Sequence, residues 1–419
     1  MRIRSTGLTL FVGLSMVMAA CTSSTTSTAP SSAPSAAVST APSVAPSAIA
    51  SAVASAVASA GASAAASGAG ADLKIGVLTD VGSVNDKNFN QFTYAGAVNG
   101  AVSVNAKAPA VVVPKAPADY DPLLQAYIDQ GYNVIVTAGF NLANATAKAA
   151  KKNPNIWFIG VDHDPCINAA GDVDTTFKDC TGVIATLLPK YIALNYQEDQ
   201  AGYLAGIVAA NATKSGVIGA VGGVAICAPC VRYIQGYALG AQATKPGIKV
   251  AVAWVTASDF VKGFFDQAGG KTFGAQFIKQ NPGIDVVFQV AGNTGNGVID
   301  AACAAKINAI GVDVDQYQSY AASQACILTS AEKHLSVSVS TSIQQIAAGT
   351  AKGGKVIYNA ANDGIGVSSF YGAASKLPAD IQATIDTAKA GMKAGTLVTC
   401  PPAPACGKTP APNPIVPAP

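Results

Sequence analysis

The chain has 419 residues, of which only 12% are charged, and its formal net charge at pH 7 is +3. This small charge, without any cluster of lysine and arginine with interleaved aromatic residues, argues against nucleic acid as a partner. Half of the residues are hydrophobic, but no apolar stretch after residue 21 is long and charge-free enough to predict a membrane-spanning helix.

The first 71 residues predict a targeting signal and a tether. A basic start precedes an apolar run, residues 8–18, that is too short to span a bilayer, and small residues follow before Cys21. We interpret residues 1–20 as a lipoprotein signal peptide and Cys21 as its lipid anchor, with an ordinary secretory signal as the alternative. Residues 21–71 are almost wholly Ser, Ala, Thr, Pro, Val and Gly, which is typical of a solvated tether. We therefore expect a lipid-anchored protein on the extracytoplasmic face of a cell membrane.

The body of the chain, from residue 72 to about 398, alternates short β-branched runs with amphipathic stretches. Its length suits two lobes better than one small core. The alternation predicts an α/β protein with doubly wound parallel sheets, in which ligands bind beyond the carboxyl ends of the strands. The predicted strands are residues 73–78, 110–113, 134–137, 157–161, 216–221, 249–255, 286–290, 309–312 and 326–329, and the predicted helices are 90–101, 122–130, 142–152, 199–210, 231–242, 270–280, 298–306 and 335–348.

The cysteines fit an oxidising compartment. Eight remain after the anchor, and an even number outside the cytoplasm favours disulfides. The spacing of Cys227 and Cys230 also allows a redox or metal site, but the surrounding pattern is not thioredoxin-like, so we favour a structural disulfide. Proximity suggests that neighbours pair, although other connectivities stay open. These neighbours are Cys166 and Cys180, Cys227 and Cys230, Cys303 and Cys326, and Cys400 and Cys406.

The two histidines, His163 and His334, lie far apart in the sequence. A metal site or a catalytic triad built on histidine is therefore not expected. We expect neither a metal nor a cofactor.

Polar or glycine-rich segments follow several predicted strands, among them Asp80, Asp162 and Asp313. Short motifs occur in the order TDVG (79–82), DKNFNQ (86–91), GYLAG (202–206), GG (222–223), AGNTGNG (291–297), GVD (311–313) and TSAEK (329–333). Each motif alone is weak, but their joint occurrence in this order is specific. From about residue 73 to residue 397 the chain resembles the basic membrane protein family, which comprises substrate-binding lipoproteins of ABC importers.

The resemblance implies a type I periplasmic-binding-protein fold, in which two α/β lobes joined by three crossovers close on a ligand, typically a purine nucleoside. We expect the crossovers near Asn195, near Gln289 and near Ser330. The expected parts are residues 72–195 and 289–330 for the N-terminal lobe, 196–288 and 331–398 for the C-terminal lobe, and 399–419 as a Pro-rich disordered tail.

The family pattern assigns roles to several residues. Phe89 matches the base-stacking phenylalanine, Asp80 the acid after the first strand, and Asp313 the ribose-binding acid. An aromatic face can stack on a base, and carboxylates can accept hydrogen bonds from hydroxyl and N–H groups. The matching lysine is Lys333, and further ligand-binding candidates are Asn90, Phe140 and Gly292.

Structural roles are the alternative for the same residues. Phe89 can pack in the core, Asp80 and Asp313 can cap turns, and Lys333 can be a solvated helix residue. Asp86 can cap the helix that follows it, and Asp315 competes with Asp313 for the ribose role.

The chain also departs from the family pattern at the Cys227–Cys230 segment and over residues 256–270. The second aromatic wall of the site is therefore open. Its candidates are Trp254, Phe260, Phe264, Phe265 and Phe140.

We expect a monomeric, non-enzymatic binding protein that captures a nucleoside between its lobes and delivers it to an ABC permease in the same membrane. One alternative is a sugar or another small polar metabolite as the ligand. A second alternative is an extracytoplasmic thiol-disulfide protein that uses Cys227 and Cys230. A further role as an adhesin or immune-facing surface lipoprotein is compatible with the tether.

Overall fold

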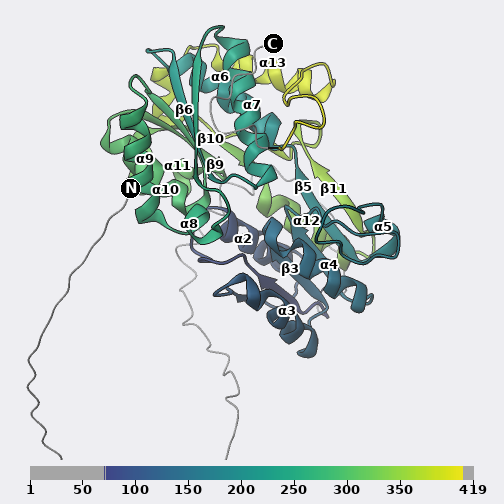
Figure 1. Ribbon diagram of the computed structural model, residues 1–419. Helices are drawn as coiled ribbons and strands as arrows, with labels where there is room; N and C mark the ends of the chain where they lie inside the picture. The colour runs from purple at the N-terminus through teal and green to yellow at the C-terminus, as the bar shows by residue number, and fades with distance from the viewer. Residues whose placement is uncertain (1–69, 71, 409–419) are drawn as a thin grey trace, which may run out of the picture. The chain divides into compact units, whose positions relative to one another are not determined.

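The structure, a computed structural model, describes residue 70 and residues 72–408 (Figure 1). The expected signal peptide, the anchor Cys21 and nearly all of the tether lie outside the described residues, as does the segment 409–419. Within the described part of the chain, no helix has the length and apolar character needed to cross a membrane.

The first sheet has six strands in the order β11-β5-β4-β3-β1-β2, and all its neighbouring strands are parallel. Strands β1 and β3 are buried along their whole length because helices cover both faces. Helices α2 and α12 lie on one face, and α3 and α4 lie on the other. The elements are β1 (Ile75–Leu78), α2 (Phe89–Ser103), β2 (Ala110–Val112), η2 (Pro117–Asp119), α3 (Tyr120–Asp129), β3 (Val134–Ala138), η3 (Phe140–Leu142), α4 (Ala143–Lys152), β4 (Trp157–Val161), α5 (Ile184–Leu187), β5 (Tyr191–Tyr196), α12 (Leu335–Ala347) and β11 (Gly354–Tyr358).

The second sheet also has six strands, in the order β12-β10-β9-β8-β6-β7, and only its edge strand β12 is antiparallel to its neighbour. Helices α6 and α7 cover one face, and α8, α9 and α10 cover the other (Figure 1). The elements are α6 (Glu198–Ala212), β6 (Val217–Val224), α7 (Ala228–Thr244), β7 (Lys249–Thr256), α8 (Phe260–Phe264), α9 (Gln267–Gln280), β8 (Val286–Val290), α10 (Gly292–Ala304), β9 (Asn308–Asp313), α11 (Gln316–Ser319), η4 (Ala321–Cys326), β10 (Ile327–Lys333), η5 (Ala360–Asn362), β12 (Ile365–Val367), η6 (Tyr371–Lys376) and α13 (Ile381–Lys393).

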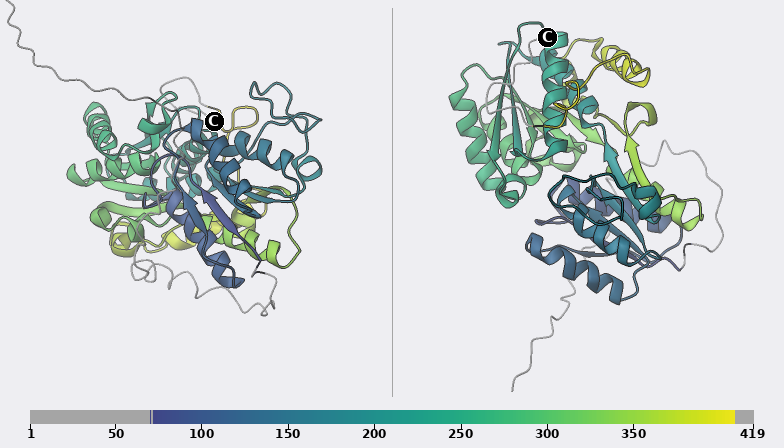
Figure 2. Two further views of the ribbon diagram at one scale, coloured as in Figure 1. Left: turned by 90° about the horizontal axis from the view of Figure 1, so that it is seen from below. Right: turned by 45° about the vertical axis from the view of Figure 1, so that its right-hand side comes forward.

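The chain passes between the two sheets after β5, after β10 and after β11. The right-hand view of Figure 2 shows β5 and β11 side by side at this connection. The first passage agrees with the crossover expected near Asn195, and the second lies after Lys333, close to the one expected near Ser330. The crossover expected near Gln289 is wrong, because β8 pairs with β6 and β9 inside the second sheet.

The expected division into lobes is corrected accordingly. Residues 289–330 belong to the second lobe, because they carry β9 and most of β10. The segment 331–398 is divided: α12 packs on α2 and β11 joins the first sheet, whereas β12 and α13 belong to the second lobe. The sequence could not show this, since a buried apolar run has the same composition in either parallel sheet.

The end of the described chain also differs from the expectation. The prediction that residues 399–419 are disordered is wrong for residues 399–408, which pack on the start of α7. The Gln235 side chain donates to the carbonyls of Ala405 at 3.0 Å and Lys408 at 3.2 Å, and the N–H of Gly407 donates back to it at 2.9 Å. The Cys400–Cys406 disulfide closes this segment.

The structure contains four disulfides among its described residues, and each joins sequence neighbours. They are the pairs that proximity suggests. The bonds join Cys166 to Cys180, Cys227 to Cys230, Cys303 to Cys326 and Cys400 to Cys406.

Helices α6 and α7 pack with their backbones in contact at glycines. A Cβ atom at Gly236 would lie 2.0 Å from the carbonyl oxygen of Asp199, and one at Gly202 would lie 2.1 Å from that of Tyr233. No flexible side chain can move aside there, so a methyl group must push the helices apart. This contact holds the start of α7 in a fixed position against α6.

We expect Gly236→Ala to lower the free energy of unfolding by about 1–3 kcal/mol, the usual cost of overpacking a core. Urea unfolding followed by circular dichroism measures the change. Gly372→Ala is the matched control, because its new Cβ would have no heavy atom closer than 3.8 Å. Equal stability of the two variants would contradict the backbone contact.

Candidate ligand-binding site

A pocket lies where the carboxyl ends of strands from both sheets meet. Its empty space, including the part open to solvent at its mouth, is about 620 Å³. All seven ligand-binding candidates from the sequence line it, although they come from six separate places along some 250 residues. They are Asp80, Phe89, Asn90, Phe140, Gly292, Asp313 and Lys333.

Two acids at strand ends have a left-handed backbone. Asp162, after β4, has φ of 61°, and Asp313, the last residue of β9, has φ of 65°. This conformation is uncommon for a residue with a side chain and is found more often at functional sites. Both carboxylates form ion pairs with the same residue, Lys333.

Lys333, at the end of β10, is the centre of a buried charge cluster. Its ammonium nitrogen lies 2.6 Å from Asp162 Oδ2, 3.3 Å from Glu198 Oε1 and 3.7 Å from Asp313 Oδ1. The side chain of Lys333 is only 2% exposed. Glu198 also accepts a hydrogen bond from Arg232 Nε at 2.6 Å. Three carboxylates and the Lys333 ammonium group therefore share one buried region, and the partly exposed Arg232 binds Glu198 at its edge.

Aromatic rings surround the same ammonium group. It lies 5.6 Å from the centroid of the Phe89 ring, 5.3 Å from that of Tyr196 and 5.5 Å from that of Tyr233. These distances are within cation–π range. Tyr233 also donates a hydrogen bond from its hydroxyl to Asp313 Oδ1 at 3.3 Å.

Burial shifts the titration of this cluster. It raises the pKa of Asp162 to about 6, although the Lys333 charge acts in the opposite direction. Burial likewise raises the pKa of Asp313, and the Lys333 charge again acts in the opposite direction. For Glu198, burial is outweighed by Arg232 and Lys333 together, which hold its pKa below the usual range. The three carboxylates outweigh the burial of Lys333 and raise its pKa, so the lysine stays charged.

Asp80 is fixed by hydrogen bonds on the first-sheet side of the pocket. Its carboxylate accepts from the Tyr120 hydroxyl, from the backbone N–H of Val81 at 2.8 Å and from Asn141 Nδ2 at 3.2 Å. Burial raises its pKa, and these hydrogen bonds act in the opposite direction.

Asp86 has the capping role that the sequence suggests. Its carboxylate accepts from the backbone N–H groups of Asn88 at 2.8 Å, Asn90 at 2.9 Å and Gln91 at 3.1 Å, which begin α2. These bonds fix the first turn of α2 and with it the position of Phe89. Asp86 also lines the pocket.

Two oxygen atoms of pocket residues are buried without a hydrogen-bond partner in the described part of the chain: Asn90 Oδ1 and Asp162 Oδ1. An unsatisfied buried polar atom costs about 1–3 kcal/mol. Because both residues line the pocket, a ligand with hydrogen-bond donors would remove this cost.

The structure shows which of the candidate aromatic residues line the pocket. Phe140, Phe264 and Phe265 line the pocket. Phe260 packs behind Phe140, with ring centroids 5.6 Å apart, and is not a lining residue. The ring of Trp254 lies against Gly222, away from the pocket. The structure thus places Phe89 and Phe140 on the first-lobe side and Phe264 and Phe265 on the second-lobe side.

Contacts between the lobes close one side of the pocket. Asn296 Nδ2 donates to the carbonyl of Asp86 at 3.0 Å, and the Ser319 hydroxyl donates to that of Lys87 at 2.7 Å. Gly82 lies against Phe265, so close that a Cβ atom would be 2.1 Å from the ring. The loop before α2 is therefore held by the second lobe.

Asp315 does not take part in the pocket. It caps α11 through the backbone N–H of Tyr317 at 3.1 Å and accepts from the Tyr371 hydroxyl. Of these two acids, the structure places Asp313 at the pocket, which agrees with the preferred alignment to the family pattern.

Sequence reasoning missed several residues of the cluster. Asp162 was recognised only as a polar residue after a strand, and Tyr233, Arg232 and Glu198 were not singled out. Glu198 and Arg232 belong to helices whose apolar patterns dominate the local sequence. No local signal shows that Glu198 reaches Lys333 or that Arg232 pairs with Glu198.

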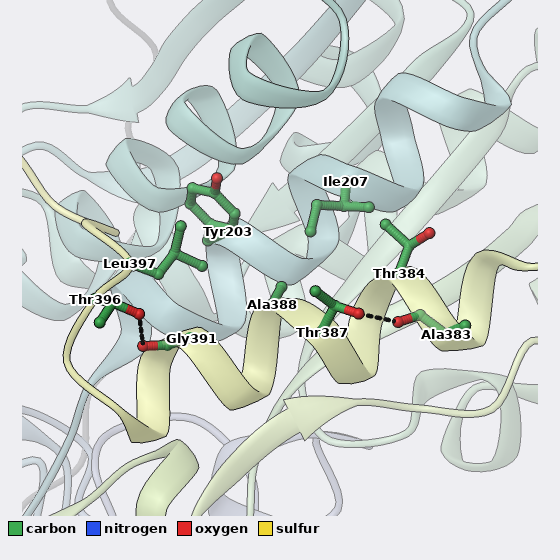
Figure 3. Close-up of a pocket in the computed structure, with 9 residues that line it drawn as sticks. All are labelled: Tyr203, Ile207, Ala383, Thr384, Thr387, Ala388, Gly391, Thr396 and Leu397. Atoms are coloured by element: carbon green, nitrogen blue, oxygen red, sulfur yellow. Dashed lines mark hydrogen bonds between the residues drawn. The ribbon is translucent and has the colours of Figure 1, made fainter.

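A second hollow lies between α6 and α13, as Figure 3 shows. Tyr203 and Ile207 form one side, and small residues of α13 form the other. Its threonine hydroxyls already donate to backbone carbonyls, such as Thr387 to Ala383 at 2.8 Å and Thr396 to Gly391 at 3.2 Å. No charged residue lines this hollow. Apart from the Tyr203 hydroxyl, its lining offers few polar groups that could orient a ligand, so the pocket between the lobes is the better candidate.

No group of three or more His, Cys, Asp or Glu side chains within the described ranges has an arrangement that could hold a metal ion. The carboxylates around Lys333 instead compensate its charge.

Two α/β lobes with a polar and aromatic pocket between them form the type I periplasmic-binding-protein fold. A solute-binding protein of an ABC transporter from Aeropyrum pernix has this fold with a TM-score of 0.64 at 22% identity, over 77% of this chain and 92% of that one. One from Conexibacter woesei has a TM-score of 0.59 at 20% identity, over 78% of this chain and 98% of that one.

Residues 73–387 match the Bmp family, described as ABC transporter substrate-binding protein PnrA-like. The chain belongs to this family. It is 31% identical to the ABC transporter nucleoside-binding protein BmpA of Lactococcus lactis, over 70% of this chain and 81% of that protein. It is 27% identical to a CD4+ T-cell-stimulating antigen of Listeria innocua, over 76% of this chain and 85% of that protein. The resemblance seen in the sequence motifs is thereby confirmed.

Proposed function

We propose that the protein binds a nucleoside, with a preference for purines, and delivers it to an ABC permease from the extracytoplasmic side of the membrane, where Cys21 anchors it. The observation that carries this proposal is the meeting of aromatic and acidic side chains in one pocket. Phe89 and the rings opposite it, Phe264 and Phe265, offer faces for a flat base, and Asp313 offers acceptors for ribose hydroxyls. The nucleoside-binding relative at 31% identity supports the same ligand class.

The unpaired acceptors refine the binding mode. Asn90 Oδ1 and Asp162 Oδ1 need donors, which base N–H groups and ribose hydroxyls supply. Asp80, held by three hydrogen bonds, is a further fixed acceptor. The ligand therefore brings mainly donors to the pocket and covers its apolar faces with the base.

The charge of the lining selects against anions. Four carboxylates line the pocket, from Asp80, Asp86, Asp162 and Asp313, and Lys333 is the one cation among the described lining residues. This lysine is already surrounded by carboxylates. A phosphate group would face an excess of negative charge in a region of low dielectric constant. We infer a preference for nucleosides over nucleotides.

Thermal unfolding of ligand-stripped protein tests the proposal. At about 100 times its dissociation constant, guanosine or adenosine should stabilise the protein by about 2.7 kcal/mol and raise its melting temperature. The matching monophosphates at the same concentration should give a clearly smaller shift. A shift with pentoses or hexoses and none with nucleosides would replace the nucleoside by a sugar, and equal shifts with nucleosides and their monophosphates would contradict the charge argument.

The thiol-disulfide alternative receives no support from the site. Cys227 is 2% exposed and Cys230 is 6% exposed, so a protein substrate has almost no sulfur surface to reach. The family and the fold are those of solute-binding proteins.

A further inference from the structure

The Cys227–Cys230 disulfide lies at the start of α7 and lines the ligand pocket together with Pro229. The other three disulfides contribute no residue to this lining. The Cys227–Cys230 segment is therefore a wall of the pocket.

The disulfide fixes the first turn of α7. Cys227 is the N-cap, and its sulfur accepts a hydrogen bond from the backbone N–H of Cys230 at 3.2 Å. One turn later, Tyr233 donates to Asp313 in the pocket, and Arg232 binds Glu198 of the charge cluster. A change in the first turn is thus transmitted to two residues that shape the site.

Access to the bond is limited from outside. Cys227 and Cys230 are 2% and 6% exposed, whereas the neighbouring Ile226 is 62% exposed and lies on the outer side of the loop. Both cysteines line the pocket, but their exposed fractions include the surface that faces it. A small reductant therefore reaches the sulfur atoms only after the first turn of α7 opens.

We propose that the Cys227–Cys230 disulfide is a ligand-contacting wall, so that ligand binding and reduction of this bond oppose each other. The proposal rests on the proposed function, since it takes the pocket as the ligand site. A bound ligand contacts the turn that the disulfide fixes and so disfavours the opening of this turn, which reduction requires. Because such coupling is reciprocal, reduction must weaken ligand binding by the same factor by which the ligand disfavours reduction.

The reaction is a thiol-disulfide exchange with a small dithiol such as dithiothreitol. Its thiolate attacks one sulfur atom of the disulfide and forms a mixed disulfide, and its second thiol then closes a ring. Two electrons pass to the protein, the reductant becomes a cyclic disulfide, and two protons end on the thiols of Cys227 and Cys230.

The first test measures the reduction rate of each disulfide in the folded full chain. Protein is treated with dithiothreitol with and without guanosine at about 100 times its dissociation constant, free thiols are alkylated, and the cysteines are assigned by mass spectrometry. We expect guanosine to slow the reduction of Cys227–Cys230 at least tenfold. Cys303–Cys326 is the control, because neither of its cysteines lines the pocket; Cys326 is 7% exposed and Cys303 is partly buried.

The outcomes separate the possible causes. Slowing confined to Cys227–Cys230 supports the proposal. Equal slowing of both disulfides shows general stabilisation by the ligand and overturns it, as does an unchanged rate of both. If guanosine and the other nucleosides fail to bind the oxidised protein at all, the proposed function falls first, and the inference falls with it.

A second test uses variants with cooperative urea unfolding. We expect the double variant Cys227→Ser with Cys230→Ser to bind guanosine at least tenfold more weakly than the wild type in calorimetry. The control variant Cys303→Ser with Cys326→Ser should bind within about twofold of the wild type. Wild-type affinity in the first variant would overturn the role of the disulfide as a wall of the site.

Discussion

Lys333→Met is expected to lower the free energy of unfolding by about 3–5 kcal/mol at pH 7.5, the usual effect of removing one partner of a buried ion pair. The methionine keeps the length of the side chain but not its charge. Asp162, Glu198 and Asp313, which lie within 3.7 Å of the ammonium nitrogen, then lose their shared counter-charge. Arg232 still compensates Glu198, so the cost falls mainly on the two aspartates. Urea unfolding of the ligand-free protein measures it.

Lys355→Met is the matched control. Lys355 also pairs with an acid, Asp164 at 3.0 Å, but the two side chains are 42% and 68% exposed. An exposed pair contributes only about 0–1 kcal/mol. If both variants lose the same stability, the burial of the Lys333 cluster is not what makes it important.

The deficit of the Lys333 variant should shrink as the pH falls from 7.5 to 5. Burial raises the pKa of Asp162 to about 6 against the opposing effect of Lys333, and removal of that charge raises it further. A carboxyl with a raised pKa in the folded state binds protons there before it does in the unfolded chain. Its protonation therefore stabilises the fold as the pH falls through the folded-state pKa. A deficit that is the same at both pH values would contradict a charge-based cause.

The sequence predicted the pocket better than the division into lobes, and the reason is physical. Asp80 and Asp313 follow apolar runs that are strands in any parallel arrangement, so their place at a carboxyl end follows from local pattern. The Val286–Val290 run contains no information on which sheet it joins. That choice depends on pairing with β6 and β9, which are distant in the sequence.

The charge cluster around Lys333 was even harder to predict from the sequence. Glu198 and Lys333 are separated by 135 positions and meet only because α6 packs against β10. Likewise, the composition of residues 399–408 predicts disorder, but Gln235 and a disulfide hold the segment in place. Contacts between segments that are remote in the sequence decided these features.

Asp313→Asn is expected to weaken nucleoside binding by about 1–1.5 kcal/mol, or roughly 5- to 13-fold, because a hydrogen bond to a charged acceptor is replaced by a weaker one to a neutral amide. The change preserves the shape of the side chain. Lys333 keeps Asp162 at 2.6 Å as its nearest counter-charge, so the protein should still unfold cooperatively. Calorimetric titration of ligand-stripped protein with guanosine measures the affinity.

Asp315→Asn separates a binding role from a general effect at the same end of β9. Asp315 lies two residues further along the chain, but its carboxylate is used by Tyr317 and Tyr371 and does not line the pocket. We expect its affinity for guanosine to stay within about threefold of the wild type. The proposed contact of Asp313 with ribose therefore requires that Asp313→Asn lowers the affinity for guanosine more than Asp315→Asn does. Equal losses would mean that the strand end responds as a unit, and an unchanged affinity in Asp313→Asn would move the ribose site to Asp80, Asp86 or Asp162, the remaining acids that line the pocket.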